Sequence, residues 1–211
     1  TMALAAAIRA GELSDKERGR QGEREVAKTT FFLSPPLPVS LSQVDWGEAP
    51  DVSQFQGRHR ELSLLHKWLV DDRCRLVAVL GMGGQGKTVL ATTATAQMDQ
   101  AFACVIWRSL RNAPPLADLL GYCIQVASQH ETQDLPTDLE QRIDLLLTYL
   151  QQRRCLLVLD NFETVLHGER VGTYRPGYGG YGRLLQRVGE GRHQSCLLLT
   201  SREQPQELIP L

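Results

Sequence analysis

Short runs of aliphatic residues alternate along this chain with longer segments whose apolar residues recur at helical spacing. The aliphatic runs predict four buried strands, near residues 75–80, 104–108, 156–160 and 196–200. The other segments predict helices over residues 58–70, 87–100, 116–129 and 138–151, and a shorter helix near 181–188. Because continuously aliphatic strands alternate with helices, we expect an α/β fold whose parallel sheet is covered on both faces.

The first 44 residues have a different character. Residues 1–30 combine an alanine-rich opening with a charged run and are compatible with a helix, which Gly19 and Gly22 would interrupt. A proline-stiffened segment follows at residues 34–38, and residues 45–53 read as a polar loop. We therefore expect an N-terminal helical and linker extension over residues 1–44 and a globular domain over residues 45–211.

A phosphate-binding motif joins the first predicted strand to the helix after it. Residues 81–88 read G-M-G-G-Q-G-K-T, which matches the P-loop pattern G-x-x-x-x-G-K-[ST]. Such a loop surrounds a polyphosphate with backbone N–H groups, and the helix directs its positive dipole end at the same anion. We expect a nucleoside triphosphate or diphosphate with Mg²⁺, Lys87 at the β- and γ-phosphates and Thr88 as a magnesium ligand. The alternative is a glycine-rich turn with a solvated lysine.

Two more polar features follow predicted strands. Asp160 ends the third strand and matches a Walker B acid, which binds magnesium directly or through water; a helix-capping aspartate is the alternative. Arg202 follows the fourth strand and could sense the γ-phosphate; a surface arginine is the alternative. Ligands of parallel sheets lie at the carboxyl ends of the strands, where the P-loop, Asp160 and Arg202 should all meet.

Hydrolysis is supported less well than binding. The attacking water needs a group that orients it, and Asn161 cannot act as a base at neutral pH. Glu163 could, if its side chain faces the phosphate. The sequence therefore supports nucleotide binding strongly and rapid hydrolysis poorly, with Lys87, Asp160, Glu163 and Arg202 as the candidate catalytic residues.

Composition excludes several other classes of protein. The 211 residues are 42% hydrophobic and 22% charged with a net charge of -1, so no global basic field attracts nucleic acid or a membrane. The apolar runs fall short of the roughly 18 residues that span a bilayer, and the opening lacks the basic start of a signal peptide. Five cysteines without a C-x-x-C pair indicate a reducing cytosol, hence a cytoplasmic protein, and we expect them to be small buried apolar residues; a metal or redox cluster is the alternative.

A glycine- and tyrosine-rich segment over residues 168–183 allows three interpretations. Its glycines favour a mobile surface loop, while a partner-docking or lid role is the second interpretation. Tyrosines interleaved with arginines can also stack on single-stranded bases. We regard nucleic-acid binding as the weakest of the three. Elsewhere, Trp68 and Trp107 are expected in the core.

Taken together, these motifs resemble the NB-ARC group of STAND signal-transduction ATPases, in particular the cyanobacterial proteins in which this ATPase precedes a WD-repeat propeller. The resemblance runs from about residue 45 to the end of the chain. It rests on D-W-G-E-A-P at 45–50, F-Q-G-R at 55–58 with Glu61, the P-loop, V-I-W-R-S-L at 105–110, L-L-V-L-D-N at 156–161 and L-T-S-R at 199–202.

The resemblance implies a P-loop NTPase three-layer sandwich and an adenine nucleotide. The segment from Phe55 to Arg58 would lie against the adenine, and no N-K-x-D guanine signature occurs. The residues expected to bind ATP or ADP are Phe55, Gly57, Arg58, Gly81, Met82, Gly83, Gly84, Gln85, Gly86, Lys87, Thr88 and Val89. The fourth strand would lie between the first and third, which would bring Arg202 between the P-loop and Asp160. In the family, ADP holds a closed monomer, and ATP with a trigger permits self-association.

Two departures from the family pattern bear on function. Many relatives carry a second acid where this chain has Asn161, which argues for slow hydrolysis. The chain ends at Leu211, so we expect an incomplete NB-ARC-type domain whose fifth strand, helical subdomains and sensor or effector domains are missing. The first strand would then leave a sheet edge open, or the N-terminal segment would cover that edge.

Three functional hypotheses follow. The first is an ATP/ADP-dependent regulatory switch with slow ATPase activity. The second is an interaction scaffold that binds nucleotide without meaningful hydrolysis. The third is another P-loop enzyme such as a small-molecule kinase, which would need an acceptor pocket and an arginine-rich lid.

Overall fold

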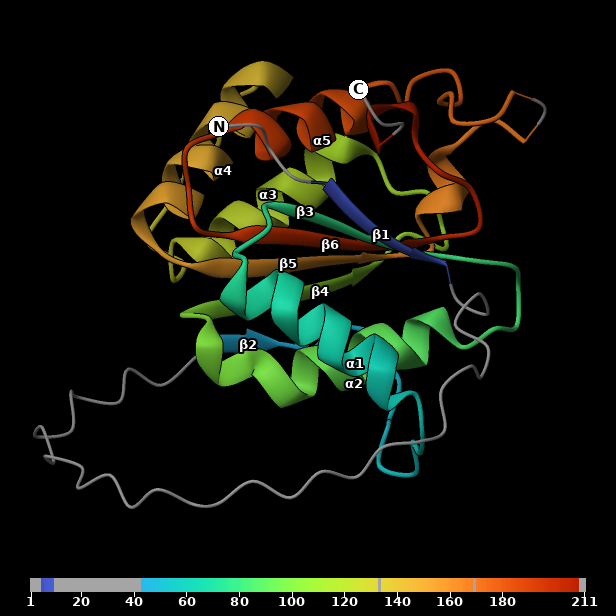
Figure 1. The fold of residues 1–211 in the computed structure, drawn as a ribbon. Helices are drawn as coiled ribbons and strands as arrows, with labels where there is room; N and C mark the ends of the chain where they lie inside the picture. The colour runs from blue at the N-terminus through green and yellow to red at the C-terminus, as the bar shows by residue number, and fades with distance from the viewer. Residues whose placement is uncertain (1–4, 10–42, 133, 169, 209–211) are drawn as a thin grey trace, which may run out of the picture.

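The computed structural model of the chain describes residues 5–9, 43–132, 134–168 and 170–208. It is a three-layer α/β sandwich, as predicted, with helices above and below one sheet (Figure 1). Two parts of the N-terminal extension that the sequence analysis discussed, the proline-stiffened segment and the charged run, lie outside the described residues.

The sheet has six strands, and every neighbouring pair is parallel. The strands lie in the order β1-β3-β6-β5-β4-β2. Their bounds are Ala5–Arg9 for β1, Gln43–Asp45 for β2, Leu76–Leu80 for β3, Cys104–Ser109 for β4, Cys155–Asp160 for β5 and Cys196–Ser201 for β6. β6 lies between β3 and β5. This confirms the expectation that the fourth predicted strand lies between the first and the third. All residues of β3, β5 and β6 are buried, which explains their unbroken aliphatic runs.

The sequence predicted four strands, and the two additional ones are the edge strands. β1 lies within the stretch that we described as compatible with a helix, and its backbone pairs with β3 from Ala5 opposite Leu76 to Arg9 opposite Leu80. β2 includes Asp45, the first residue of the predicted polar loop, and pairs with β4. Both strands are short and form because a neighbouring edge offers unpaired backbone groups, so their own periodicity could not predict them. Of the two arrangements expected at the edge of β3, the structure has the N-terminal segment covering it.

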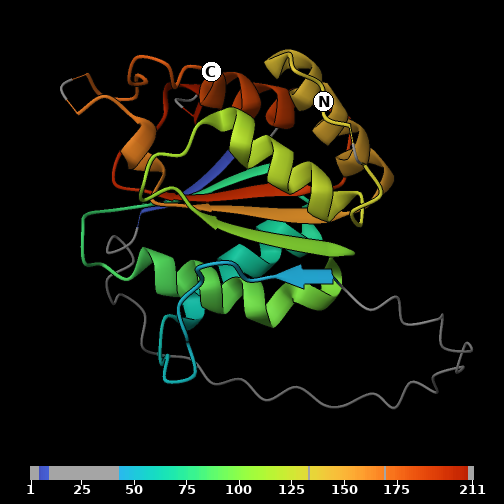
Figure 2. The ribbon, with the colours of Figure 1, turned by 180° about the vertical axis from the view of Figure 1, so that it is seen from behind.

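Helices cover both faces of the sheet. α1 (His59–His66), which continues as a π-helical turn over Lys67–Asp71, and α2 (Lys87–Met98) lie on one face. α3 (Leu116–Ala127), α4 (Leu139–Gln152) and α5 (Gly180–Glu190) lie on the other, as Figures 1 and 2 show. One apolar core fills each interface, and β strands contribute alternate residues to the two cores.

Local sequence accounts for where several helices begin. Pro115 precedes α3, where its fixed φ suits the helix start. Asp138 caps α4, since its carboxylate accepts a hydrogen bond of 3.0 Å from the Gln141 N–H. Gly86 caps α2 with a φ of 72°, a left-handed conformation that favours glycine.

The cysteines, Trp107 and Trp68 belong to the cores. All five cysteines are buried free thiols, as the interpretation of small apolar residues predicts. Trp107 is fully buried, while Trp68 packs at the margin of the core beneath α1. No helix among the described residues is long and apolar enough to cross a bilayer.

Candidate functional site

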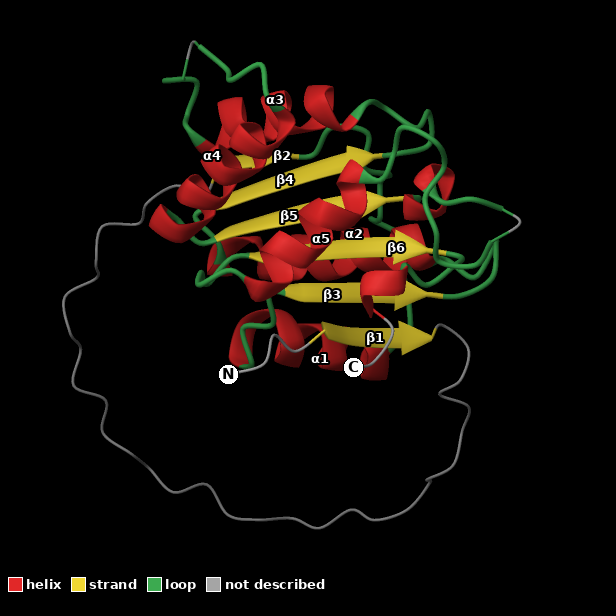
Figure 3. Cartoon of the chain, turned by 90° about the horizontal axis from the view of Figure 1, so that it is seen from above, coloured by secondary structure: helices red, strands yellow, loops and turns green. Residues whose placement is uncertain are grey.

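The loops that follow β3, β5 and β6 gather at one rim of the sheet, because neighbouring strands are parallel and their arrows point the same way (Figure 3). The P-loop, Asp160 and Arg202 therefore share this rim, as expected from a parallel sheet. The rim joins residues that are far apart in sequence through contacts of ordinary hydrogen-bond length.

The P-loop connects β3 to α2 through backbone that requires glycine. Gly84 has a φ of 79°, and a Cβ atom built there would meet nothing within 4 Å, so the space above this residue is open. The Met82 N–H donates to the Gln85 side-chain oxygen at 2.9 Å, while the Met82 side chain is exposed. The loop is thus stabilised by a hydrogen bond between its own residues, while Gly84 and the Met82 side chain face open space. Val89, in the first turn of α2, is half-buried.

Lys87 lies inside the loop. Its ammonium donates to the carbonyl oxygens of Gly81 at 2.9 Å and Met82 at 3.0 Å, and the residue is 9% exposed. Burial lowers the pKa of Lys87, the charge of Arg202 adds to this effect, and the charge of Glu163 opposes it. A cation is therefore held where a phosphate chain in the loop would meet it.

A single carboxylate oxygen of Asp160 joins three elements. Asp160 Oδ1 accepts hydrogen bonds from the Thr88 hydroxyl at 2.8 Å and the Thr200 hydroxyl at 2.5 Å. The Asn161 N–H in turn donates to Thr200 Oγ1 at 3.1 Å. Asp160 is 3% exposed, so this arrangement is buried and fixed. The sequence analysis gave Thr200 no role; its position at the end of the predicted strand over residues 196–200 was the available signal.

The two proposed magnesium ligands, Thr88 and Asp160, thus lie in direct contact. Within the described ranges, no three His, Cys, Asp or Glu side chains gather to hold a metal ion by themselves. One hydroxyl and one carboxylate suit Mg²⁺, which usually takes one or two protein ligands and completes its shell with phosphate oxygens and water.

Arg202 and Glu163 form an ion pair beside the loop. Arg202 Nε lies 3.0 Å from Glu163 Oε1, and the Arg202 N–H donates to Glu163 Oε2 at 3.3 Å. A Cβ atom at Gly83 would lie 3.3 Å from the Arg202 guanidinium carbon, so the guanidinium lies against the P-loop.

The segment before α1 reaches the loop through Arg58. Arg58 has a φ of 52° and donates from Nη2 to the Gln85 carbonyl. Its Nη1 is buried and has no hydrogen-bond partner within the part of the chain that the structure describes. Gly57 also has a positive φ, whereas the Phe55 side chain packs against the core on the α1–α2 face. Of the residues expected to contact adenine, Arg58 is therefore the one that touches the P-loop.

These observations fit a bound polyphosphate. Such an anion needs hydrogen-bond donors, which the buried ammonium of Lys87 and the unpartnered Arg58 Nη1 can provide. It also needs space, which is open over Gly84. The hydroxyl of Thr88 and the carboxylate of Asp160 lie at the adjoining edge of the loop.

The tyrosines of the glycine- and tyrosine-rich segment are packed and not free on the surface, although other residues of the segment, such as Val171, are exposed. The tyrosine rings face inward: Tyr181 is fully buried, and Tyr174 and Tyr178 pack against the core on the α3–α5 face. Their hydroxyls are fixed too, because Tyr174 donates to Glu207 at 2.6 Å and Tyr178 to the Ala113 carbonyl at 2.7 Å. Aromatic packing outweighs glycine content here, and rings engaged in this way cannot stack on bases.

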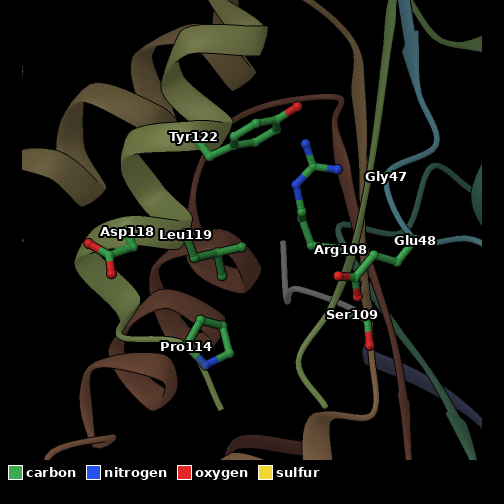
Figure 4. Close-up of a pocket in the computed structure, with 8 residues that line it drawn as sticks. All are labelled: Gly47, Glu48, Arg108, Ser109, Pro114, Asp118, Leu119 and Tyr122. Atoms are coloured by element: carbon green, nitrogen blue, oxygen red, sulfur yellow. The ribbon is translucent and has the colours of Figure 1, made fainter. Parts of the chain in front are cut away.

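A separate hollow of about 380 Å³ lies at the same rim, beyond β5 (Figure 4). Figure 4 shows Leu119 and Pro114 on one side and the Glu48 carboxylate on the other. Arg108 closes one end, with its guanidinium 3.5 Å from the centre of the Tyr122 ring. This hollow lies on the α3 face of the sheet, and the residues that line it do not belong to the P-loop.

Arg108 ties the edge strand β2 to β4. Its guanidinium binds both carboxylate oxygens of Asp45, at 3.2 and 2.8 Å, and the Tyr122 hydroxyl also donates to Asp45. Burial alone would raise the pKa of Asp45, but the hydrogen bonds from Tyr122 and Arg108 and the charge of Arg108 outweigh it, so the pKa is lowered. Gly47 has a φ of 47°, and a Cβ atom there would lie 2.7 Å from the Trp107 carbonyl oxygen, so glycine is required beside this pair.

Replacing Arg108 by methionine is expected to lower the free energy of unfolding by about 1–3 kcal/mol, because Asp45 would remain half-buried without its cation. The lowered pKa gives the pair a pH dependence: its contribution is full above the ordinary aspartate pKa of 3.8 and is lost as the pH falls below it. Urea unfolding at neutral and acid pH measures both effects. Arg187→Met is the control, since that arginine pairs with an exposed Asp144. Equal losses in the two variants would contradict the assignment.

Comparisons with known proteins identify the family to which these motifs belong. The profile of the NB-ARC domain family matches residues 58–177, which include the P-loop and Asp160 but end before Arg202. An uncharacterized WD repeat-containing protein of Nostoc sp. (strain PCC 7120) is 46% identical over 205 residues, which cover 92% of this chain and 16% of that protein. A disease resistance protein of Oryza sativa subsp. japonica is 31% identical over 102 residues, which cover 46% of this chain and 9% of that protein. The chain thus spans less than a fifth of either relative.

Proposed function

Because the chain belongs to the NB-ARC family of nucleotide-binding domains, we propose that it is a regulatory switch of the STAND type that binds ATP or ADP with Mg²⁺. We further propose that it hydrolyses ATP slowly and self-associates in the ATP state. One observation carries the proposal: the Thr88 hydroxyl lies 2.8 Å from Asp160 Oδ1, so the two proposed magnesium ligands meet beside the ammonium of Lys87.

Each residue at the rim has a proposed part in binding. The N–H groups of the loop and of the first turn of α2 would donate to the phosphates, and Lys87 would neutralise the β- and γ-phosphates. Thr88 and Asp160 would hold Mg²⁺, which supplies positive charge against the phosphate oxygens. Arg58 and the neighbouring Phe55 and Gly57 would lie toward the adenine, and the unpartnered Arg58 Nη1 offers a donor there.

Slow hydrolysis agrees with the absence of an oriented base among the described residues at this rim. Both Glu163 oxygens accept from Arg202, and Asn161 is an amide whose Oδ1 is buried. These same contacts favour the second candidate function, an interaction scaffold that binds nucleotide without meaningful hydrolysis.

Single-turnover hydrolysis of labelled ATP separates the two candidates. We expect a rate that is slow but above that of a Lys87→Ala control, because positioning and charge neutralisation remain even without a base. A rate equal to the control would reject the switch with ATPase activity in favour of the scaffold. Light scattering on the same samples tests self-association: the mass should rise with ATP and not with ADP, and equal masses would contradict it.

The remaining proposals concern the whole protein. We propose that residues 1–44 form an extension whose residues 5–9 and 43–44 join the edges of the sheet, that residues 45–211 carry the nucleotide-binding domain, and that the protein works in the cytoplasm. The Nostoc relative is named as a WD repeat-containing protein. Sensor or effector domains of that kind are the partners we propose, together with adenine nucleotide, and neither a membrane nor nucleic acid is among them.

A further inference from the structure

The ion pair between Glu163 and Arg202 holds one arginine at two points. One carboxylate oxygen binds the Arg202 side chain at Nε, 3.0 Å away, and the other accepts from its backbone N–H at 3.3 Å. Glu163 follows β5 and Arg202 follows β6, so the pair bridges two neighbouring strand ends.

The two partners differ in how firmly they are held. The Glu163 side chain is 14% exposed, whereas that of Arg202 is 62% exposed. Phe162, next to Glu163, is fully buried, with its ring edge-on to those of Tyr174 and Tyr181. The carboxylate is therefore fixed by the core, while the guanidinium is the partner that can move.

The pair also lies on the phosphate-binding loop. The Arg202 guanidinium lies against Gly83, and Lys87 feels the charges of Glu163, Arg202 and Asp160. A negative group added at the outer end of a bound phosphate chain would be attracted by Arg202 and repelled by Glu163.

We propose that Glu163 is a specificity-determining residue that sets the preference between triphosphate and diphosphate by competing with the terminal phosphate for Arg202. The inference rests on the proposed nucleotide binding. A triphosphate must draw the exposed guanidinium from a fixed carboxylate, and a diphosphate need not. Glu163 thus lowers the affinity for ATP and leaves the affinity for ADP nearly unchanged. This role differs from the water orientation expected from the sequence.

Replacing Glu163 by glutamine tests the inference, because glutamine keeps the shape and removes the charge. Calorimetry with ATP and with ADP at fixed Mg²⁺ should show ATP binding about three- to tenfold tighter than in the wild type, the range expected for a partly exposed ion pair. ADP affinity should change by less than about twofold. Glu140→Gln is the matched control, since it breaks an exposed pair with Arg183 away from the loop and should change neither affinity.

Arg202→Ala completes the comparison. It should narrow the gap between ATP and ADP affinity, and adding Glu163→Gln to it should have no further effect, since the two residues act through one contact. The exposure of Arg202 makes this variant compatible with folding. The ¹⁵N resonance of Arg202 Nε, recorded without nucleotide, should shift in Glu163→Gln and stay unchanged in Glu140→Gln.

The outcomes separate the two proposals. Wild-type protein that binds neither ATP nor ADP would overturn the proposed function and the inference with it. Normal wild-type binding with an ATP-to-ADP ratio that Glu163→Gln leaves unchanged would overturn the inference alone. An Arg202 Nε resonance that does not respond to Glu163→Gln would overturn it too, because the ion pair would then be absent in solution.

Discussion

Replacing Lys87 by alanine is expected to weaken ATP binding roughly 100-fold or more, the loss that removal of a charged hydrogen-bond donor from a phosphate site implies. Both the charge of the Lys87 ammonium and its position account for the expected loss of affinity. The ammonium is 9% exposed and fixed on the carbonyls of Gly81 and Met82, so it meets a bound phosphate chain without being drawn in from solvent.

Isothermal calorimetry with ATP and Mg²⁺ measures this loss. Lys67→Ala is the control, because that lysine pairs with Asp72 on the surface and lies at the end of α1, outside the loop. Lys87→Met, which keeps the aliphatic stem, should behave like Lys87→Ala if the charge is what matters. Unchanged ATP affinity in both Lys87 variants would show that the loop is not the phosphate site.

The second large effect is expected from Asp160→Asn, which should remove the dependence of ATP binding on Mg²⁺. Asparagine keeps an Oδ1 that can accept from the hydroxyls of Thr88 and Thr200, so the buried contacts can survive while the negative charge is lost. In the wild type, Mg²⁺ should strengthen ATP binding by about tenfold or more, since a carboxylate close to the ion contributes at least about 1.4 kcal/mol.

Calorimetry in Mg²⁺ and in EDTA gives this dependence directly. The Asp160→Asn protein should give nearly the same ATP affinity in both. Asp144→Asn, on the exposed face of α4, should keep the wild-type difference. If Asp160→Asn also keeps the full difference, Asp160 is not the carboxylate that holds the metal, and the Walker B assignment is wrong.

The central strands were predictable because their signal is local, whereas the place of β6 between β3 and β5 was implied by the family resemblance. Each of β3, β5 and β6 is buried along its whole length and so carries an unbroken aliphatic run. The edge strands were not predictable, since β1 and β2 owe their conformation to a neighbouring strand that offers free backbone groups. Composition misled in the tyrosine-rich segment, where distant core residues such as Phe162 decide the packing.

The candidate site divides in the same way. The P-loop and Asp160 follow from motifs next to strands, and the parallel topology brings them to one rim. The pairing of Arg202 with Glu163 and the contact of Thr200 with Asp160 join residues about forty positions apart. Such contacts depend on side-chain directions that no local pattern contains. The ion pair of Glu163 with Arg202 therefore came into view only with the structure.

The meeting of two hydroxyls on one oxygen of Asp160 has a mechanical consequence. Thr88 of α2 and Thr200 of β6 both donate to that oxygen, which belongs to Asp160 of β5. Displacement of any one of these three elements therefore breaks a hydrogen bond to another. Displacement of the start of α2 would therefore reach the ends of β5 and β6 through Asp160. We therefore expect the start of α2 and the ends of β5 and β6 to move as one unit.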